Sequence, residues 1–300
     1  MPIAISRLRA FLLFCAALAS WSAPASRALD EPATFVIHRV SGDETLMSIA
    51  RAHGLGFVEL RAANAQIDPW LPGAGSEIVV PTLHLAPSTD ADGIVINLAD
   101  QRLYLFDGAG SPVRSFPVGI GRAGCETPTG TTRVVRKRRN PTWVPPASIR
   151  SVRPELPAAI PPGPNNPLGA YALTLGWDGY VIHGTNRPEG IGRRVSHGCL
   201  RLYPEDIERL FGLVRVGAKV AIVDQEVKLD WIGDDLYLEI HPSQRQADQI
   251  EVGGTFEPEP LAGLHKAIEH SLQDRGLGID WDAVKNAADQ RSGVPLRISR

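Results

Sequence analysis

Residues 93–118 read GIVINLADQRLYLFDGAGSPVRSFPV, and apolar side chains occupy alternate positions through most of this stretch. The alternation covers 94–98, 103–105 and 113–118, and an Asp-Gly dipeptide at 107–108 separates the last two runs. A period of two is that of a strand with one buried face, and Asp-Gly favours tight hairpin turns. The stretch therefore predicts consecutive hairpin strands, and with them a mainly β protein.

Further strand and helix patterns follow this stretch. Strand character returns at 170–174, 180–183 and 218–223, and residues 204–211 have the apolar spacing of a short helix. Residues 228–240 alternate around a Gly-Asp turn, which predicts a terminal hairpin. The charged region that follows has mixed helical spacing and no readable role.

Nine prolines fall between Asn140 and Pro167. Proline removes a backbone donor and disrupts helix interiors, so we expect neither a central strand nor a helix here. The segment should be an ordered loop, and Trp143 within it suggests a lid over a site. A rigid structural loop is the alternative.

The region 35–81 reads as a small unit of its own. An apolar β-favouring run opens at Phe35, a Gly-Asp turn follows, and helix-spaced apolar positions occupy 45–53 and 57–64 before Ile78 to Val80 return as a strand. The predicted order is β-α-α-β. A stretch rich in Pro, Ser and Asp at 85–92 makes a plausible linker to the next domain.

The composition is that of an ordinary globular protein, with 43% hydrophobic and 21% charged residues. The formal net charge is -2, and Arg136 to Arg139 form the one extended basic run. Nucleic acid is therefore not an expected partner, because binding it requires a surface with many Lys and Arg contacts to phosphate.

The N-terminus has the pattern of an export signal. Arg7 and Arg9 precede the apolar run Ala10–Ala19, and small residues before Ala28 offer a cleavage site. A membrane anchor is the alternative, but the run falls well short of the ~20 residues that span a bilayer. We expect residues 1–28 to be a signal peptide and the mature protein to be extracytoplasmic.

Two cysteines remain after cleavage, Cys125 and Cys199. They could form one disulfide in an oxidising compartment. A single bridge is not needed to hold a core of this size, so at least one thiol must be considered a reactive group.

The strongest chemical signal is His183-Gly184-Thr185-Asn186 followed by Ser196-His197-Gly198-Cys199-Leu200-Arg201. A thiol needs a nearby base or cation to become a good nucleophile, and His183 can supply one if the fold brings it beside Cys199. Gly198 allows close backbone approach, and the amides near it could face a developing oxyanion.

A zinc site is a weaker interpretation of these residues, because a closed zinc site needs four ligands. An inert buried cysteine also explains these residues poorly.

HGTN followed by SHGCLRL resembles the signature of the L,D-transpeptidase catalytic (YkuD) domain, and the similarity covers about residues 92–225. It includes IVIN with QRLYLF at 94–106, GIG at 119–121, TPTG at 127–130 and NPTW at 140–143. The implied fold is a mixed, β-sandwich-like catalytic domain. The implied enzyme is a peptidoglycan L,D-transpeptidase that needs no metal and no organic cofactor.

The resemblance also implies a role for each matching residue. Cys199 would attack the carbonyl of the third residue of a tetrapeptide stem, expel the terminal D-alanine and form a thioester. His183 would act as the base, with its ring fixed by the carbonyl of Gly184. The remaining assignments are His197 and Gly198 in the anion pocket, and Ser196, Thr185, Trp143 and Arg201 as substrate-binding residues. For Arg201, a substrate carboxylate and a solvated surface position remain equally open.

Residues 35–81 resemble a LysM module, which implies binding to peptidoglycan glycan, although a module that binds nothing remains an alternative. Together with a C-terminal hairpin and tail at 226–300, the layout resembles the ErfK/YbiS/YcfS/YnhG group of exported enzymes, which implies a periplasmic location.

The acyl acceptor could be another stem peptide or an envelope protein's lysine, and carbapenems would be acylating inhibitors. A hydrolase of the same bonds and a non-catalytic wall-binding protein remain alternatives. Cys125 is either a buried bystander or a partner that pairs with Cys199 under oxidation.

Overall fold

The computed structural model describes residues 32–89, 92–108, 112–273 and 275–300. Within these residues, no helix combines the length and apolar character that crossing a membrane requires. The predicted signal peptide at 1–28 lies outside the described part of the chain.

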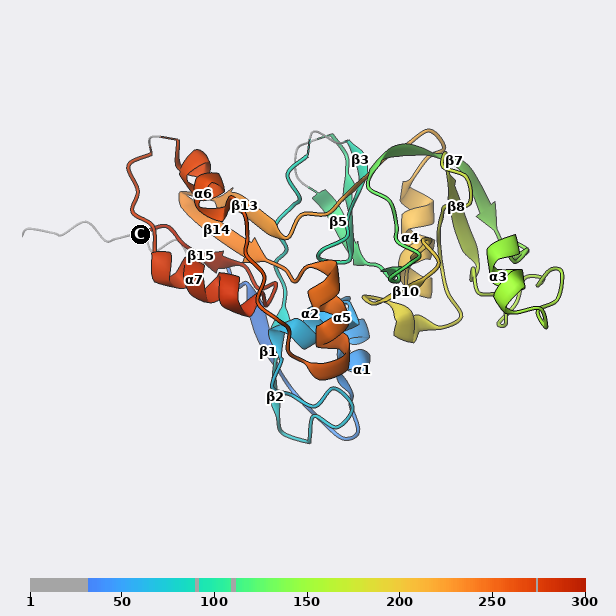
Figure 1. The fold of residues 1–300 in the computed structure, drawn as a ribbon, viewed down its shortest axis with the longest axis horizontal. Coiled ribbons are helices and arrows are strands. Elements are labelled where there is room, and N and C mark those ends of the chain that lie inside the picture. Colours follow the sequence, from blue (N-terminus) through green and yellow to red (C-terminus); the bar gives the residue numbers. More distant parts are fainter. Residues whose placement is uncertain (1–31, 90–91, 109–111, 274) are drawn as a thin grey trace, which may run out of the picture. The chain divides into compact units, whose positions relative to one another are not determined.

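The N-terminal unit has the predicted β-α-α-β order (Figure 1). Its two strands pair antiparallel. Thr45 caps the first helix, because its side chain accepts a hydrogen bond from the backbone amide of Ser48. The elements are β1 (Phe35–Arg39), α1 (Leu46–Ala52), α2 (Phe57–Ala63) and β2 (Glu77–Pro81).

The main domain is built on an eight-stranded sheet with the order β11-β9-β8-β7-β12-β3-β4-β5. The hairpin strands predicted for 93–118 are confirmed, as is the short helix α4 (Pro204–Leu213). The strands are β3 (Gly93–Asn97), β4 (Arg102–Phe106), β5 (Pro112–Pro117), β7 (Gly130–Arg139), β8 (Tyr171–Leu175), β9 (Val181–His183), β11 (Leu200–Arg201) and β12 (Lys219–Val223).

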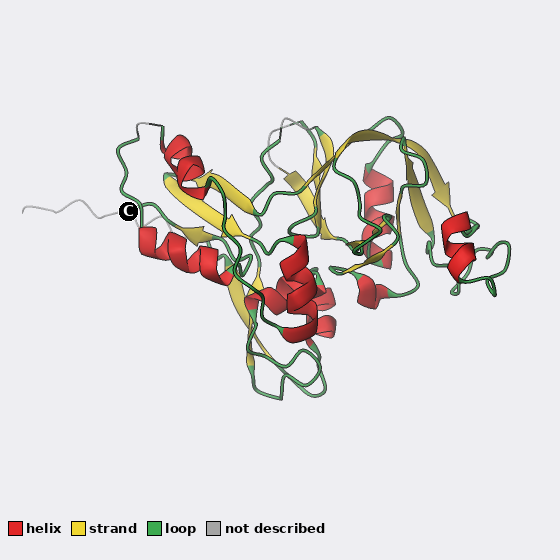
Figure 2. Ribbon diagram, viewed as in Figure 1, coloured by secondary structure: helices red, strands yellow, loops and turns green. Residues whose placement is uncertain are grey.

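The long strand β7 turns this sheet into one curled layer (Figures 1 and 2). Its first half pairs with β12 and its second half with β8, and a β-bulge lies between Val134 and Arg136. A bulge bends a strand and increases its twist. The mainly β prediction is therefore confirmed, but the sheet is a single curled one and not two stacked sheets of a sandwich.

The central strands are buried on both faces. Ile94 and Ile96 point into the largest core cluster, which α4 covers with Ile207 and Leu210, whereas Val95 belongs to a second cluster on the opposite face. The basic run on β7 also has a structural role. Lys137 donates hydrogen bonds to two carbonyls at the C-terminal end of α4, where a cation interacts favourably with the helix dipole.

The proline-rich segment 140–167 contains a helix, α3 (Ala147–Val152), so the expectation that no helix forms there was wrong. The six residues of α3 include no proline, and Pro146 stands at its N-cap, where a missing amide hydrogen costs nothing. The segment is held by Asn166, which is fully buried and whose amide nitrogen donates to three backbone carbonyls, at Pro141, Ile160 and Pro161.

The C-terminal hairpin is confirmed as β13 (Val227–Ile232) and β14 (Asp235–Ile240), joined at its edge by β15 (Leu296–Arg297). Three helices, α5 (Gln244–Gly253), α6 (Leu264–Leu272) and α7 (Trp281–Gln290), complete this region. Helix α5 packs on the N-terminal unit, because Ala247 and Ile250 belong to the same core cluster as Leu46 and Phe57. The tail is thus part of the folded core.

Candidate active site

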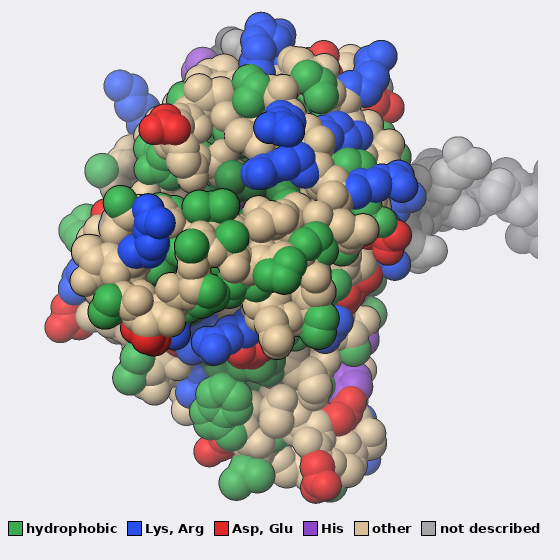
Figure 3. Space-filling model, turned by 90° about the vertical axis from the view of Figure 1, so that its right-hand side faces the viewer, with side chains coloured by type: hydrophobic (Ala, Val, Ile, Leu, Met, Phe, Trp, Pro, Cys, Tyr) green, Lys and Arg blue, Asp and Glu red, His purple; other side chains and the backbone are tan. Residues whose placement is uncertain are grey.

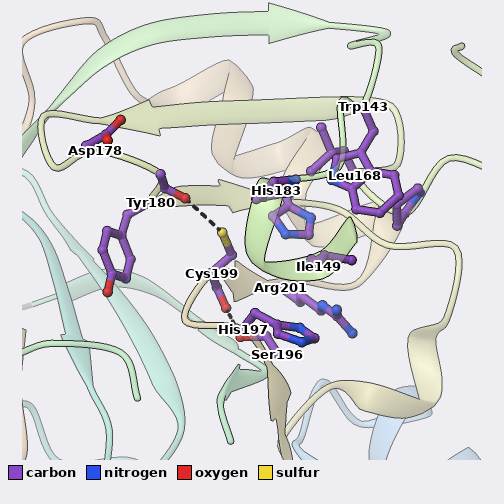
Figure 4. Close-up of a pocket in the computed structure, with 13 residues that line it drawn as sticks. Trp143, Ile149, Leu168, Asp178, Tyr180, His183, Ser196, His197, Cys199 and Arg201 are labelled. Atoms are coloured by element: carbon purple, nitrogen blue, oxygen red, sulfur yellow. Dashed lines mark hydrogen bonds between the residues drawn. The ribbon is translucent and has the colours of Figure 1, made fainter. Parts of the chain in front are cut away.

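A cavity of about 260 Å³ brings together residues that the sequence predicted as a catalytic set (Figure 4). The sulfur of Cys199 and the ring of His183 both project into it, with Trp143 and Leu168 on one side and His197 and Arg201 on the other. Two of the predicted residues, Gly184 and Gly198, contribute backbone geometry and do not line the cavity.

Strand pairing brings the cysteine close to the histidine. Strands β9 and β11 are parallel neighbours, with Arg201 opposite His183 and Leu200 opposite Ile182. Cys199 directly precedes β11, and its side chain lines the same cavity as those of His183 and Arg201. Two residues that are 16 positions apart in the chain therefore meet at one cavity.

His183 is held as a neutral base. It is only 4% exposed, and its Nδ1 lies 2.5 Å from the carbonyl oxygen of Gly184. A carbonyl only accepts, so Nδ1 must carry the proton and Nε2 is left to accept one. Burial, and then the positive charge of Arg201, lower the pKa of His183 to about 3, so the ring is neutral at physiological pH.

The Cys199 thiol is protonated at rest. Burial raises its pKa, an effect that a backbone hydrogen bond at Val181 and the charge of Arg201 oppose only in part. The thiol lies 3.4 Å from the carbonyl oxygen of Gly179, which can accept its hydrogen. The resting pair is therefore a neutral thiol and a neutral imidazole, and the proton must leave the sulfur when the sulfur attacks.

Ser196 fixes the turn that carries the cysteine. Its hydroxyl donates to the carbonyl of Cys199 at 2.6 Å and accepts from the amide of Gly198 at 3.1 Å. Gly198 has φ of 100°, and a Cβ there would meet the ring of Tyr180 at 3.0 Å. The Gly198 amide is thus already occupied, so this residue serves the site by its conformation.

Arg201 lies in the wall between this cavity and a second one of about 440 Å³. Its Nε is buried and has no hydrogen-bond partner among the described residues. The rest of the half-buried guanidinium borders both cavities, where its planar fork can bind an anion bidentately. His197 also lines both cavities, and its Nδ1 lies 3.4 Å from a guanidinium nitrogen of Arg122.

The proline-rich segment covers both cavities. Trp143 lines each of them, and its backbone exchanges hydrogen bonds with Ile160 at 2.9 and 2.8 Å. Thr185 is buried and lines only the second cavity, where its hydroxyl accepts from the Arg187 amide. Figure 3 looks onto this side of the molecule, where hydrophobic side chains lie among Lys and Arg.

Two residues that support the site went unassigned in the sequence analysis. Thr127 accepts from the amide of Gly121 and donates to the carbonyl of Gly198, both at 3.0 Å. Tyr180 lines the cavity beside the catalytic turn. The TPTG motif was a signal for Thr127, whereas nothing local distinguishes Tyr180 from an ordinary strand residue.

Cys125 is a free, half-buried thiol, as is Cys199. Its amide closes a turn onto the carbonyl of Arg122. Pairing of the two cysteines under oxidation stays a prediction.

One group elsewhere has the ligand spacing of a metal site. Side-chain atoms of Asp100, Glu239 and His241 lie within 4.8 Å of one another, and all three residues are buried. However, the ammonium of Lys228 lies 2.8 Å from Asp100 and 2.6 Å from Glu239. The lysine places a positive charge between the two carboxylates, where a metal ion would have to lie, so the cluster is a buried ionic group.

Comparison with known proteins shows which family the chain belongs to. Residues 91–222 match the model of the L,D-transpeptidase catalytic domain, YkuD. The probable L,D-transpeptidase ErfK/SrfK of Salmonella typhimurium is 38% identical over 91% of this chain and 88% of its own length. The probable L,D-transpeptidase YcfS of Escherichia coli is 36% identical over 98% of this chain and 95% of its own. The catalytic domain of an Enterococcus faecium L,D-transpeptidase acylated by ertapenem is 23% identical, covering 45% of this chain and 99% of that domain, with a TM-score of 0.35.

The chain therefore belongs to the L,D-transpeptidase family, a family of acyl-transferring enzymes. Its similarity to ErfK/SrfK and YcfS extends beyond the catalytic domain to nearly the whole chain, including the N-terminal unit and the C-terminal helices.

Proposed function

We propose that the protein is a peptidoglycan L,D-transpeptidase that works through a thioester on Cys199. The observation that carries this proposal is the shared cavity of His183 and Cys199, in which the imidazole has its Nε2 free to accept a proton. Family membership supplies the reaction type, and the stem-peptide substrate comes with it.

The first half-reaction forms the thioester. Nε2 of His183 takes the thiol proton as Sγ of Cys199 bonds to the carbonyl carbon of the third stem residue. The carbonyl oxygen becomes negative, and the backbone amide of Cys199 is the donor we assign to it, since the Gly198 amide already serves Ser196. The bond to the terminal D-alanine then breaks, and the imidazolium returns its proton to the leaving amine.

The second half-reaction transfers the acyl group to an amine. The amine attacks the thioester carbon, His183 takes its proton, and the thiol is restored. The acceptor is another stem peptide or a lysine of an envelope protein. The lid segment around Trp143 favours an amine over water, because a nucleophile held in line gains a large effective molarity in a narrow channel.

Arg201 receives a substrate carboxylate in this scheme. Its guanidinium faces both cavities and its buried Nε lacks a partner among the described residues, so a carboxylate there would give Nε a hydrogen-bond acceptor and the guanidinium an opposite charge. Carbapenems would acylate Cys199, and the catalytic domain of the E. faecium L,D-transpeptidase is acylated by one of them, ertapenem.

The setting of the reaction follows from the rest of the chain. An export signal at 1–28 would deliver the enzyme to the periplasm, where peptidoglycan is the substrate. The N-terminal unit, whose β-α-α-β order is that of a LysM module, would hold the enzyme on the glycan.

Incubation of the mature protein with isolated sacculi tests transfer against hydrolysis. We expect released D-alanine together with stem-to-stem dimers, or muropeptides linked to an added acceptor protein, because the acyl group passes to an amine. The products are identified by mass spectrometry after glycan digestion, with Cys199→Ala as the control that yields none. Shortened stems as the sole product would contradict transfer and indicate a hydrolase.

A further inference from the structure

The catalytic turn is attached to helix α5 through the strand that leads into it. Strand β10 (Arg194–Ser196) runs directly into the turn that ends at Cys199. From this strand, Nη1 of Arg194 donates to the carbonyl of Gln244 at 2.7 Å and lies 2.8 Å from the carboxylate of Asp248. The Arg194 side chain is only 6% exposed, so these two partners take the place of water around its buried charge.

The same guanidinium also holds the strand beside β10. Nε of Arg194 donates to the carbonyl of Gly121 at 3.4 Å, on the two-residue strand β6 (Ile120–Gly121), which pairs with β10. The amide of Gly121 is bound by Thr127, which in turn holds the carbonyl of Gly198. A continuous set of hydrogen bonds thus connects α5 to the backbone of the cysteine turn.

Helix α5 is a fixed support for these contacts. Positions 244, 248 and 251 share one face of the helix by their spacing and meet Arg194 and the neighbouring Arg193. The adjacent face buries Ala247 and Ile250 in the core of the N-terminal unit. Arg194 therefore binds to a helix that is itself held in place by packing against the N-terminal unit.

The N-terminal unit also contacts the segment just before β10 directly. Amides at the start of α2 donate to the carbonyls of Ile191 and Gly192 at 3.2 and 3.0 Å. The backbones approach so closely that a Cβ on Gly192 would lie 2.1 Å from the Cα of Gly56. The segment 191–194 is therefore held from two sides, by α2 and by α5.

We propose that Arg194 is a positioning residue for acyl transfer, and that helix α5, through Asp248, sets the angle at which the turn presents Cys199 to His183. This inference rests on the proposed function. It gives the N-terminal unit and α5 a role in the chemistry itself, apart from any binding to the cell wall. Displacing a reacting group by about 1 Å can cost roughly 10²-fold in rate, so a modest shift of this turn has a measurable effect.

Acylation of Cys199 by a soluble carbapenem tests the proposal, because this reaction needs no glycan. Asp248→Ala should lower the maximal acylation rate about 10-fold and leave the half-saturating carbapenem concentration unchanged, since the displaced group is the nucleophile and not the binding surface. Asp248→Asn keeps an acceptor for the Arg194 hydrogen bond and should recover most of the rate. Arg194→Met should lose at least as much as Asp248→Ala.

The matched control is Arg245→Met on the same helix, because Arg245 pairs with Glu257 and Glu259 away from β10 and should remain within twofold of the wild type. Melting temperatures of all variants are measured alongside. Asp248→Ala with a wild-type rate, or with a loss confined to the half-saturating concentration, would overturn the positioning role. A wild-type protein that is never acylated would instead overturn the proposed function.

Discussion

His183→Gln is expected to slow acylation of Cys199 at pH 7 by about 10²- to 10⁴-fold, the usual contribution of a positioned general base. The thiol is protonated at rest because burial raises its pKa, and the free Nε2 of His183 is the acceptor that the site offers. Glutamine keeps the size of the side chain but accepts a proton poorly. The measurement is the rate of carbapenem adduct formation, followed by intact-protein mass spectrometry.

The pH dependence of the acylation rate distinguishes a general base at His183 from a side chain that only fills space. Because the pKa of His183 is lowered to about 3, the wild-type imidazole stays neutral as the pH falls from 7 to 5 and the acylation rate should change little. The base is lost only as the pH approaches about 3. His183→Gln should instead gain rate steeply above pH 8, as hydroxide generates the thiolate. Exposed His270→Gln on α6 is the control, and equal rates at pH 7 for His183→Gln and wild type would contradict the assignment.

Lys228→Met is expected to destabilise the fold by about 3–5 kcal/mol at pH 7, the usual cost of removing one partner from a buried ion pair. Lys228 is fully buried, and its ammonium contacts Asp100, Glu239 and the hydroxyl of Tyr104. Methionine fills the space but leaves two carboxylates in the core without a counter-charge. Chemical denaturation of the mature protein measures the loss.

The pH dependence of the unfolding free energy gives a second test of this ion-pair cluster. Burial would raise the pKa of Glu239, but Lys228 and then His241 bring it down to about 2, so in the wild type its stabilising contribution is present above about pH 4.5 and is lost as the pH falls toward 2. Without Lys228 the carboxylate of Glu239 becomes easier to protonate, so the difference in unfolding free energy between variant and wild type should narrow from pH 7 to pH 4. Exposed Lys285→Met should change stability by less than about 0.5 kcal/mol. A Lys228→Met protein as stable as wild type at pH 7 would show that the cluster does not support the fold.

Local patterns were enough to predict most of the strands. In 94–98 and 103–105 every second side chain faces the main core, which gives the period of two, although the predicted single buried face was wrong because Val95 and Tyr104 are buried on the opposite side. The position of β12 between β7 and β3 could not be predicted from local patterns, because it pairs strands that are distant in the sequence. The missed helix α3 shows a different limit, because the prolines on either side of it hid a proline-free helix of six residues.

The site was predictable where a motif carried it. His183, Ser196 and Cys199 come from two short motifs whose residue types already suggest acyl transfer, and the structure brings them to one cavity. The residues that hold the site's loop and strand in place could not be predicted. Asn166 donates to carbonyls up to 25 positions away, and Arg194 contacts residues 50 and 54 positions away, and a single polar residue gives no sign of such partners beforehand.

Peptide mapping of the acyl-enzyme tests the central claim most directly. The mature protein is incubated with a tetrapeptide stem donor in the absence of an acceptor, quenched in acid, digested and analysed by mass spectrometry. We expect one adduct with the mass of the acyl group, on the peptide that contains Cys199. Hydroxylamine should release it, and it should be absent from Cys199→Ala. An adduct on any other residue, or one that persists in Cys199→Ala, would contradict it.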